Sequence, residues 1–370
     1  MKVVKLKDIC TKGSSSLKQK YVQGKTGKYP VFGASGLIGY IDSYHQEKEY
    51  IGIVKDGSGI GRVMFLPPKS SVIGTLQYIL PKPGYDINYI GYCLKSLDLA
   101  SHKQGAAIPH IYFRDYGEKS VNVEESLDEQ RKIVEKLNAA FERIDRMQIN
   151  AETALEEAKC VLAQIIRNSF IPTRNWEEKS IGDLSKDIRY GTSKPSCENG
   201  KYLYLRMNNI TSDGHLTLKD TKTISLDGAE YEKAVVRKGD ILFNRTNSLE
   251  HVGKTCVFDQ EEEMIIAGYL IRVRLKGEII PEFVAYFLNC DTTKTILRKL
   301  AIGAVHQANI SASSLKKVMI KFPKSKAEQE QIVAQIKKIE DKIKVLKCNL
   351  DTITEKCNAL KHALLKETFE

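Results

Sequence analysis

A repeat at long range constrains the fold of this chain more than any other feature of its sequence. The segment SLDEQRKIVEKL, which begins at Ser126, aligns with SKAEQEQIVAQI, which begins at Ser325. This shift of 199 residues also places Phe170 on Phe369. One register therefore holds over a large part of the 370 residues, and it predicts a duplicated unit in which a variable piece precedes a long helix.

Heptad periodicity predicts that the two long helices form a coiled coil. Both open with Ser-x-x-Glu, a capping box whose side chains satisfy backbone N–H groups of the first turn. In the second helix, apolar residues recur at alternating steps of four and three, as the seam of a left-handed coiled coil requires. This seam is Ile332, Ile336, Ile339, Ile343, Leu346, Leu350, Ile353, Cys357, Leu360 and Leu364. Subtracting the shift gives the first seam, Ile133, Leu137, Ala140, Ile144, Met147, Ala151, Ala154, Ala158, Val161 and Ile165. We expect an antiparallel pair of helices, each of about 40 residues and roughly 60 Å.

The two variable pieces have the pattern of mixed helix and sheet. Glycine-punctuated apolar runs such as YPVFGASGLIGYI and GDILFNRTNS predict strands separated by turns. Each piece then contains one helical stretch, INYIGYCLKSLDLASHK or PEFVAYFLNCDTTKTILRKL. We therefore predict an α+β fold with two pseudo-symmetric globular domains, residues 1–123 and 173–323, separated by two helical regions, residues 124–172 and 324–370.

Charge favours a polyanionic partner. The net charge is +11, and residues 1–123 carry 17 basic and 9 acidic groups, while residues 173–323 carry 23 and 19. No apolar stretch approaches the roughly 18–20 residues that span a bilayer, and MKVVKLKDIC lacks the apolar core of a signal peptide. The eight cysteines form no C-x-x-C pair, which favours reduced thiols. These observations predict a cytoplasmic protein that binds nucleic acid and no membrane.

Signatures of catalysis are absent from the sequence. There is no Asn-Pro-Pro-Tyr or Asp-Pro-Pro-Tyr motif for adenine methylation and no Pro-Asp dipeptide of the common nuclease type. Gly-Lys-Thr occurs at 24–26 and 253–255 without the upstream glycine of a phosphate-binding loop. The seven histidines show no metal-ligand spacing. We expect this chain to catalyse no reaction and to bind neither a metal nor a cofactor.

Candidate DNA contacts are amide, guanidinium and ammonium groups in loops that follow strand-like runs. Arginine can pair with guanine and asparagine or glutamine with adenine, whereas lysine mainly binds phosphate. The candidates in the first domain are Lys55, Ser58, Arg62, Lys103 and Gln104. Those in the second domain are Arg206, Asn208, Asn209, Asn244, Arg245, Asn247, His306, Gln307 and Asn309. The alternative for each is a solvated loop or a structural turn, because Asn and Asp are common turn formers.

The order and duplication of these motifs resemble the specificity (S) subunits of Type I restriction-modification enzymes over the whole chain. Matching segments are KDGSGIG and GTLQYILP in the first half, and GDILFNRT and GAVHQANIS in the second. The pattern Phe-Pro-x4-Glu-Gln-x2-Ile at Phe322–Ile332 is similar to the family's helix entrance. The first copy departs from it, since Val123 and Glu124 stand where Phe-Pro would.

The resemblance implies a non-catalytic subunit that reads a bipartite, asymmetric target in double-stranded DNA, one half-site per globular domain. The helices would set the gap between half-sites. Two methyltransferase (modification) subunits would dock on the helices, and restriction subunits would join through them. S-adenosylmethionine, ATP and Mg²⁺ would be used by those partners in a prokaryotic cytoplasm.

Three alternatives stay open at this point. The chain could belong to a fused restriction-methylation enzyme, which differs in the partner subunit. It could be a stand-alone DNA-binding regulator, although the sequence has no helix-turn-helix pattern. It could also be a coiled-coil scaffold that binds two protein partners.

Overall fold

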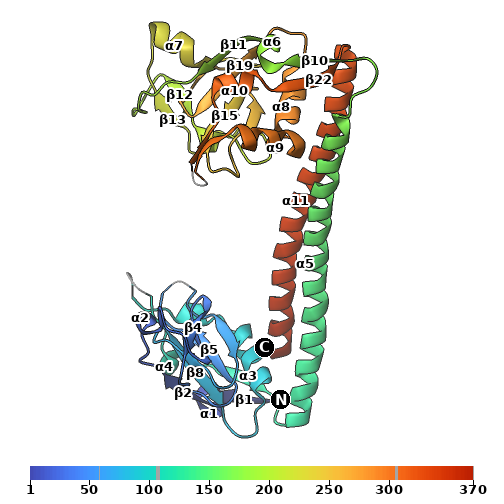
Figure 1. The fold of residues 1–370 in the computed structure, drawn as a ribbon. Helices are drawn as coiled ribbons and strands as arrows, with labels where there is room; N and C mark the ends of the chain where they lie inside the picture. The colour runs from blue at the N-terminus through green and yellow to red at the C-terminus, as the bar shows by residue number, and fades with distance from the viewer. Residues whose placement is uncertain (58, 106–108, 305–306, 370) are drawn as a thin grey trace. The chain divides into compact units, whose positions relative to one another are not determined.

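The computed structural model describes residues 1–57, 59–105, 109–304 and 307–369, and it divides into two compact units (Figure 1). Unit 1 comprises Met1–Glu152 and Asn349–Glu370, and unit 2 comprises Thr153–Cys348. Each unit therefore holds one globular domain together with parts of both long helices, α5 (Leu127–Ser169) and α11 (Lys326–Phe369). The predicted α+β class with two domains and two long helices is confirmed. The four sequence boundaries given above stay predictions.

The first domain is built on a four-stranded antiparallel sheet of order β2-β8-β5-β6. A smaller sheet, β4-β3-β7, and the pair β1-β9 complete it. The strands are β1 (Lys2–Lys5), β2 (Cys10–Ser14), β3 (Tyr29–Gly33), β4 (Gly36–Ile41), β5 (Tyr50–Val54), β6 (Val63–Leu66), β7 (Ser71–Val72), β8 (Leu76–Pro81) and β9 (Ser120–Val123). The helices are α1 (Leu6–Ile9), α2 (Gln19–Val22), α3 (Ile87–Ser96), the 3₁₀ helix η1 (Leu99–His102) and α4 (Phe113–Tyr116).

The second domain repeats this plan with the order β11-β19-β15-β17 in its central sheet. Its other sheets are β13-β12-β18-β14, β16-β21-β20 and the pair β10-β22. The strands are β10 (Trp176–Ser180), β11 (Ser185–Tyr190), β12 (Tyr202–Leu205), β13 (Lys222–Ile224), β14 (Val235–Val236), β15 (Ile241–Asn244), β16 (Thr246–Asn247), β17 (Thr255–Val257), β18 (Met264–Ile266), β19 (Leu270–Leu275), β20 (Ile302–Ala304), β21 (Gln307–Asn309) and β22 (Met319–Pro323). The helices are α6 (Ile181–Leu184), η2 (Met207–Asn209), α7 (Gly228–Ala234), α8 (Pro281–Asn289), α9 (Asp291–Leu300) and α10 (Ala312–Lys316).

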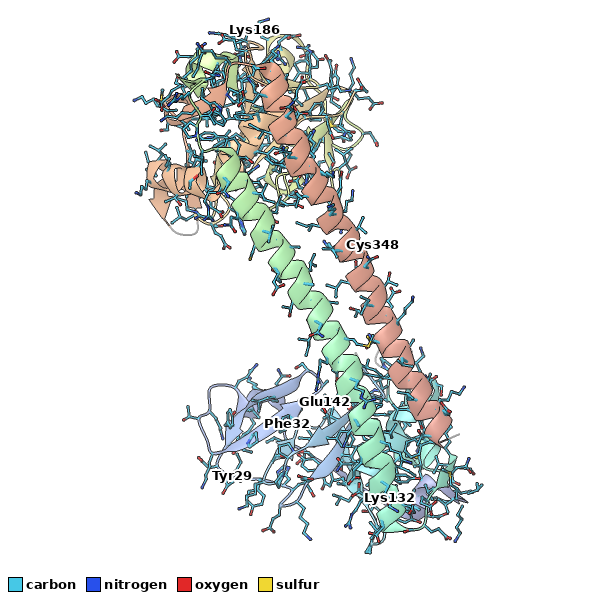
Figure 2. All side chains as sticks on the ribbon, turned by 90° about the vertical axis from the view of Figure 1, so that its right-hand side faces the viewer. Tyr29, Phe32, Lys132, Glu142, Lys186 and Cys348 are labelled. Atoms are coloured by element: carbon cyan, nitrogen blue, oxygen red, sulfur yellow. The ribbon has the colours of Figure 1, made fainter. Side chains whose placement is uncertain are left out.

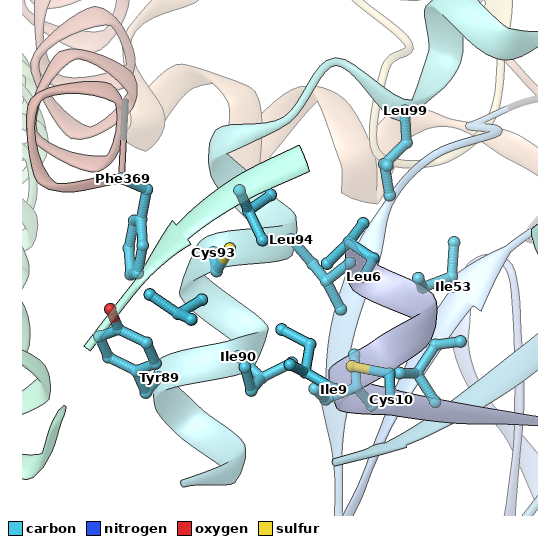
Figure 3. Close-up of a cluster of buried hydrophobic side chains, with 14 of the residues drawn as sticks. Leu6, Ile9, Cys10, Ile53, Tyr89, Ile90, Cys93, Leu94, Leu99 and Phe369 are labelled. Atoms are coloured by element: carbon cyan, nitrogen blue, oxygen red, sulfur yellow. The ribbon is translucent and has the colours of Figure 1, made fainter. Parts of the chain in front are cut away.

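The end of a long helix completes the core of each domain. In unit 1, Phe369 of α11 packs edge-on against Tyr89 of α3, with ring centroids 5.1 Å apart (Figure 3). In unit 2, Phe170, just after α5, packs in the same way against Phe283 of α8 at 5.0 Å. Phe170 and Phe369 are the two residues that the 199-residue shift aligns. The sequence repeat thus places an equivalent phenylalanine against the core of each domain.

A buried glutamine fixes the start of each long helix to its domain. The Gln130 amide accepts from the Asp86 backbone N–H at 2.7 Å and donates to the carbonyls of Gly84 and Glu124. Both Gln130 and Gln329 are fully buried. This explains the Glu-Gln pair of the sequence motif, whose glutamine joins the helix to two backbone segments.

Gln329 makes the same three bonds in the second domain. Its amide accepts from the Ile280 N–H at 2.9 Å and donates to the carbonyls of Glu278 and Pro323. Since both copies place the same amide between the same two segments, the attachment of helix to domain is part of the duplicated plan.

The helices of unit 1 are antiparallel, as expected. Leu137 shares a core cluster with Leu365, and further along α5 the Cys357 thiol lies 3.8 Å from the Ile144 carbonyl oxygen. Positions that increase along α5 therefore meet positions that decrease along α11. An ion pair between Lys361 and Asp145 borders this contact.

The seam prediction is wrong at five positions. Met147, Ala154 and Val161 on α5 and Leu346 and Leu360 on α11 are exposed, whereas the other predicted seam positions are buried or half-buried. On α5 the inward positions after Ile144 are 148, 151, 155, 158, 162 and 165. The inward residues still recur at alternating steps of four and three. Every second one of them, beginning at 148, lies one residue later in the sequence than predicted. Adjacent apolar residues such as Val161 and Leu162 make two heptad frames possible on α5. Subtracting 199 from the second seam selected Val161, which is exposed, instead of Leu162, which is half-buried.

Candidate nucleic-acid interface

One edge of the central sheet gathers the predicted loops in each domain. Because β2 and β5 both run antiparallel to β8, they end where β8 begins, and β11 and β15 end in the same way where β19 begins. The residue after β5, Lys55, donates its backbone N–H to the Thr75 carbonyl at 3.0 Å. Arg245, after β15, donates likewise to the Tyr269 carbonyl at 3.0 Å. We call this the strand-end edge; in domain 1 it comprises Ser14, Lys55 and Thr75, and in domain 2 Tyr190, Arg245 and Tyr269.

A second loop joins the strand-end edge at equivalent positions of the two domains. The Ile111 N–H donates to the Lys55 carbonyl at 3.0 Å, and the Ile310 N–H donates to the Arg245 carbonyl at 2.9 Å. The structure therefore brings Lys55 together with the segment that follows Gln104, and Arg245 with the segment that contains Asn309. These are the loops that sequence alone selected as DNA contacts.

In domain 1 the candidates line the strand-end edge with mostly exposed side chains. Lys55 is half-buried and 4.0 Å from Asp56, which in turn contacts the His110 ring at 2.7 Å. Arg62 is exposed and donates to the Ala34 carbonyl at 3.0 Å. Lys103 and Gln104 are exposed, and the Gln104 amide donates to the Asp115 carboxylate at 3.0 Å. Ser58 lies outside the described residues.

In domain 2 the loop candidates come from three places. Asn208, on η2, and Gln307, on β21, are exposed. Asn247 and Asn309 are half-buried on the paired strands β16 and β21, where the Thr246 hydroxyl donates to the Asn309 amide oxygen at 2.6 Å. Arg206 is half-buried and donates to the Asp220 carbonyl at 2.9 Å. His306 lies outside the described residues.

Arg245 is held in a defined orientation. Its guanidinium carbon lies 4.8 Å from the centroid of the Tyr190 ring, and Nη1 donates to the Gly268 carbonyl at 3.4 Å. The Tyr190 hydroxyl accepts from the Ala312 N–H at 2.7 Å, which fixes the ring. A stacked, planar guanidinium loses little side-chain entropy when it binds a base or a phosphate. At the equivalent position domain 1 has Lys55, so the two edges differ in chemistry.

Asn209 has a structural role that the sequence prediction did not assign to it. Its side chain is fully buried, its Oδ1 accepts from the Arg206 N–H at 2.9 Å, and its Nδ2 donates to the Thr217 carbonyl at 2.9 Å. All of its polar atoms therefore serve the turn around η2, which is the alternative reading of asparagine in a loop.

Asn244 is also fully buried, at the last position of β15. Neither its Nδ2 nor its Oδ1 has a hydrogen-bond partner within the part of the chain that the structure describes. Its equivalent in domain 1 is Val54, because Val54 pairs with Leu76 and Asn244 pairs with Leu270. The fold therefore accepts an apolar side chain here, and burial places the Asn244 amide away from the surface that a base could reach.

A Gly-Lys-Tyr motif that sequence reasoning missed is present in both domains. Gly-Lys-Tyr occurs at 27–29 and again at 200–202. Tyr29 packs edge-on against Tyr44 at 4.8 Å, and Tyr202 lies 5.1 Å from Tyr231. A Cβ on the glycine of either motif would collide with the backbone of the neighbouring strand. The motif is offset by 173 residues rather than 199, which is why the repeat register did not find it.

The described residues hold no group of three or more histidine, cysteine, aspartate or glutamate side chains arranged to bind a metal. Within the same residues, no helix has the length and apolarity needed to cross a membrane.

The protein is a two-domain α+β protein in which each domain is joined to two long helices. Comparisons with known proteins identify its family. The family model for the Type I restriction modification DNA specificity domain matches residues 1–157 and 173–355. The chain belongs to this family.

Curated relatives agree with that assignment. The chain is 28% identical over 203 residues to the putative type I restriction enzyme MjaX specificity subunit of Methanocaldococcus jannaschii, covering 53% of this chain and 45% of the relative. It is 23% identical over 259 residues to the EcoKI specificity subunit of Escherichia coli K12, covering 66% and 55%. The chain thus spans about half the length of these relatives.

Solved structures share the fold. A chain from a structure on complex assembly and conformational transition of the type I R-M system has a TM-score of 0.73 at 18% identity, covering 99% of this chain and 96% of that chain. The HsdS subunit of Thermoanaerobacter tengcongensis has a TM-score of 0.57 at 18% identity, covering 99% and 95%.

Proposed function

We propose that this chain is a DNA-specificity subunit that reads a bipartite, asymmetric target in double-stranded DNA, one half-site per globular domain. The observation that carries the proposal is the pair of strand-end edges. The two domains share one backbone frame there, yet Ser14 and Lys55 in the first correspond to Tyr190 and Arg245 in the second. One frame with different side chains is what two readers of different sequences need.

The chain is proposed to direct other subunits and to catalyse no reaction itself. Two methyltransferase subunits would bind along α5 and α11, and restriction subunits would join through them. These partners would use S-adenosylmethionine, ATP and Mg²⁺ in the cytoplasm of a prokaryote. Family membership supports this assignment. A fused restriction-methylation enzyme would use the chain in the same way.

The test is a methylation map. The chain is co-expressed with the neighbouring methyltransferase subunit, and N6-methyladenine is located across the host genome by single-molecule sequencing. We expect two short defined blocks around a fixed undefined gap. Replacing residues 173–323 with those of another family member should change one block and leave the other. If the two proteins do not associate at all, the proposal is wrong, and a regulator or scaffold takes its place.

A further inference from the structure

We infer that domain 1 carries, on the acid-free segment between Ile9 and Ile41, a binding surface for the DNA phosphate backbone that is more strongly positive than the equivalent segment of domain 2. This lysine–tyrosine surface consists of Lys12, Lys18, Lys20, Tyr21, Lys25 and Lys28. The inference rests on the proposed function. It assigns to this surface a contribution to DNA affinity that does not depend on the base sequence.

The first observation is a segment without acidic side chains. From Ile9 to Ile41 there is no aspartate or glutamate, and there are five lysines. The equivalent segment of domain 2 extends from Leu184 to Ile224, as the ends of α1 and α6 and the strand pairings of Ile41 and Ile224 show. That segment contains seven basic residues but also four acidic residues, Asp187, Glu198, Asp213 and Asp220, so its net charge is +3 against +5 in domain 1. The duplication therefore kept the backbone and made the charge unequal.

The second observation is that these lysines are exposed and uncompensated. Among the residues that the structure describes, none of the five lysines makes an ion pair, and all five are exposed. Elsewhere in the same domain, Lys2 pairs with Glu125, and Lys5 and Lys7 both pair with Glu118. Uncompensated charges of one sign add up to a potential that attracts a polyanion.

The third observation is the location of the surface. Its segment leaves β2 at the strand-end edge, where the Gly74 N–H donates to the Leu17 carbonyl at 2.8 Å beside Thr75. The buried Val22 fixes α2 against β4, while Tyr21 is 54% exposed. In Figure 1, α2 lies at the end of domain 1 opposite α5, and in the view of Figure 2, Tyr29 lies apart from Lys132 and Glu142 of α5. The surface thus continues the strand-end edge and stays clear of the helices of unit 1.

The chemistry favours phosphate over base edges. A lysine ammonium is a compact charge that donates hydrogen bonds and accepts none, so it binds phosphate oxygens without reading sequence. The Lys25 ammonium lies 3.3 Å from the centroid of the Tyr21 ring, a contact that holds the ammonium in place without neutralising its charge. Duplex DNA beside the first half-site is the partner that this arrangement fits.

The test measures salt dependence. The complex with the methyltransferase subunit is titrated onto a duplex that contains the mapped target, at several salt concentrations. Each phosphate contact contributes ~0.9 to the slope of log K against log salt. We expect the triple substitution Lys18→Gln, Lys20→Gln and Lys25→Gln to lower that slope by about 2.7, while the methylated sequence stays the same.

The matched control removes three paired lysines from the same domain, Lys2→Gln, Lys5→Gln and Lys7→Gln. It changes the net charge equally, and we expect an unchanged slope. An unchanged slope in the first triple variant, or an equal loss in both, would overturn the inference. Weaker assembly with the methyltransferase at an unchanged DNA slope would overturn it in favour of a protein partner. A wild-type complex that binds no DNA would instead refute the proposed function. Thermal melting of both variants checks that they are folded.

Discussion

At the scale of single residues, Gln329 provides the sharpest prediction. Gln329→Met keeps the length of the side chain but leaves the Ile280 N–H and two carbonyls without their partner. Each buried polar group left unpaired costs about 1–3 kcal/mol, so we expect a clear drop in the melting temperature. Gln331→Met is the control, because Gln331 is exposed on the same helix. Similar melting temperatures for the two variants would show that the amide bonds contribute little.

Asn244 gives the opposite prediction. Asn244→Val introduces the residue of the equivalent position in domain 1 and removes a buried amide that has no partner among the described residues. We expect the free energy of unfolding to rise by about 1 kcal/mol or more. Asn209→Ala, which removes an amide with partners on both sides, should lower it. Loss of stability in Asn244→Val would instead mean that a bound water satisfies the amide.

These two asparagines also show what a sequence can and cannot predict about a site. Both follow strand-like runs in a basic domain, so both had the pattern of a base-reading residue. One lies in the hydrogen-bonded interior of a turn and the other inside a sheet, and burial depends on the packing of segments far apart in the chain. The arginine at 245 was selected by its loop, but its stacking on Tyr190 depends on the pairing of β11 with β19, which a single sequence does not reveal.

At the scale of elements, the corrected heptad frame can be tested on α5. Ile144 is buried and Met147 is exposed, although the sequence placed both in the seam. We expect Ile144→Ala to lower the free energy of unfolding by about 2–4 kcal/mol, and Met147→Ala to change it by less than about 0.5 kcal/mol. Chemical denaturation followed by circular dichroism measures both. Equal losses of stability in the two variants would support the predicted seam, in which both residues face the partner helix.

The long helices were the most predictable elements, and their contact surface was the least. Capping boxes and uninterrupted periodicity over many turns mark the helices in the sequence alone. The heptad frame of the seam depends on which of two neighbouring rows of apolar residues along the helix packs against the facing helix. That choice is made by the facing helix and by the domain core, where Leu137 and Leu365 meet.

At the scale of the whole molecule, the helices are expected to set the distance between half-sites. Inserting four residues into α5 should change the length of the undefined gap in the methylated motif and leave both defined blocks as they are. The methylation map of the variant measures this directly. Altered blocks with an unchanged gap would refute the spacer role.

The packing of Phe369 on Tyr89 has a consequence for biosynthesis. Translation proceeds from the first domain, yet an aromatic side chain of its core arrives with the last residues of α11. The second domain receives Phe170 before its own sheet has been made. A nascent chain can therefore complete the core of the later domain first, and the earlier domain becomes whole only after α11 has been made. A stop codon anywhere between the second domain and Phe369 would then damage the domain that was made first.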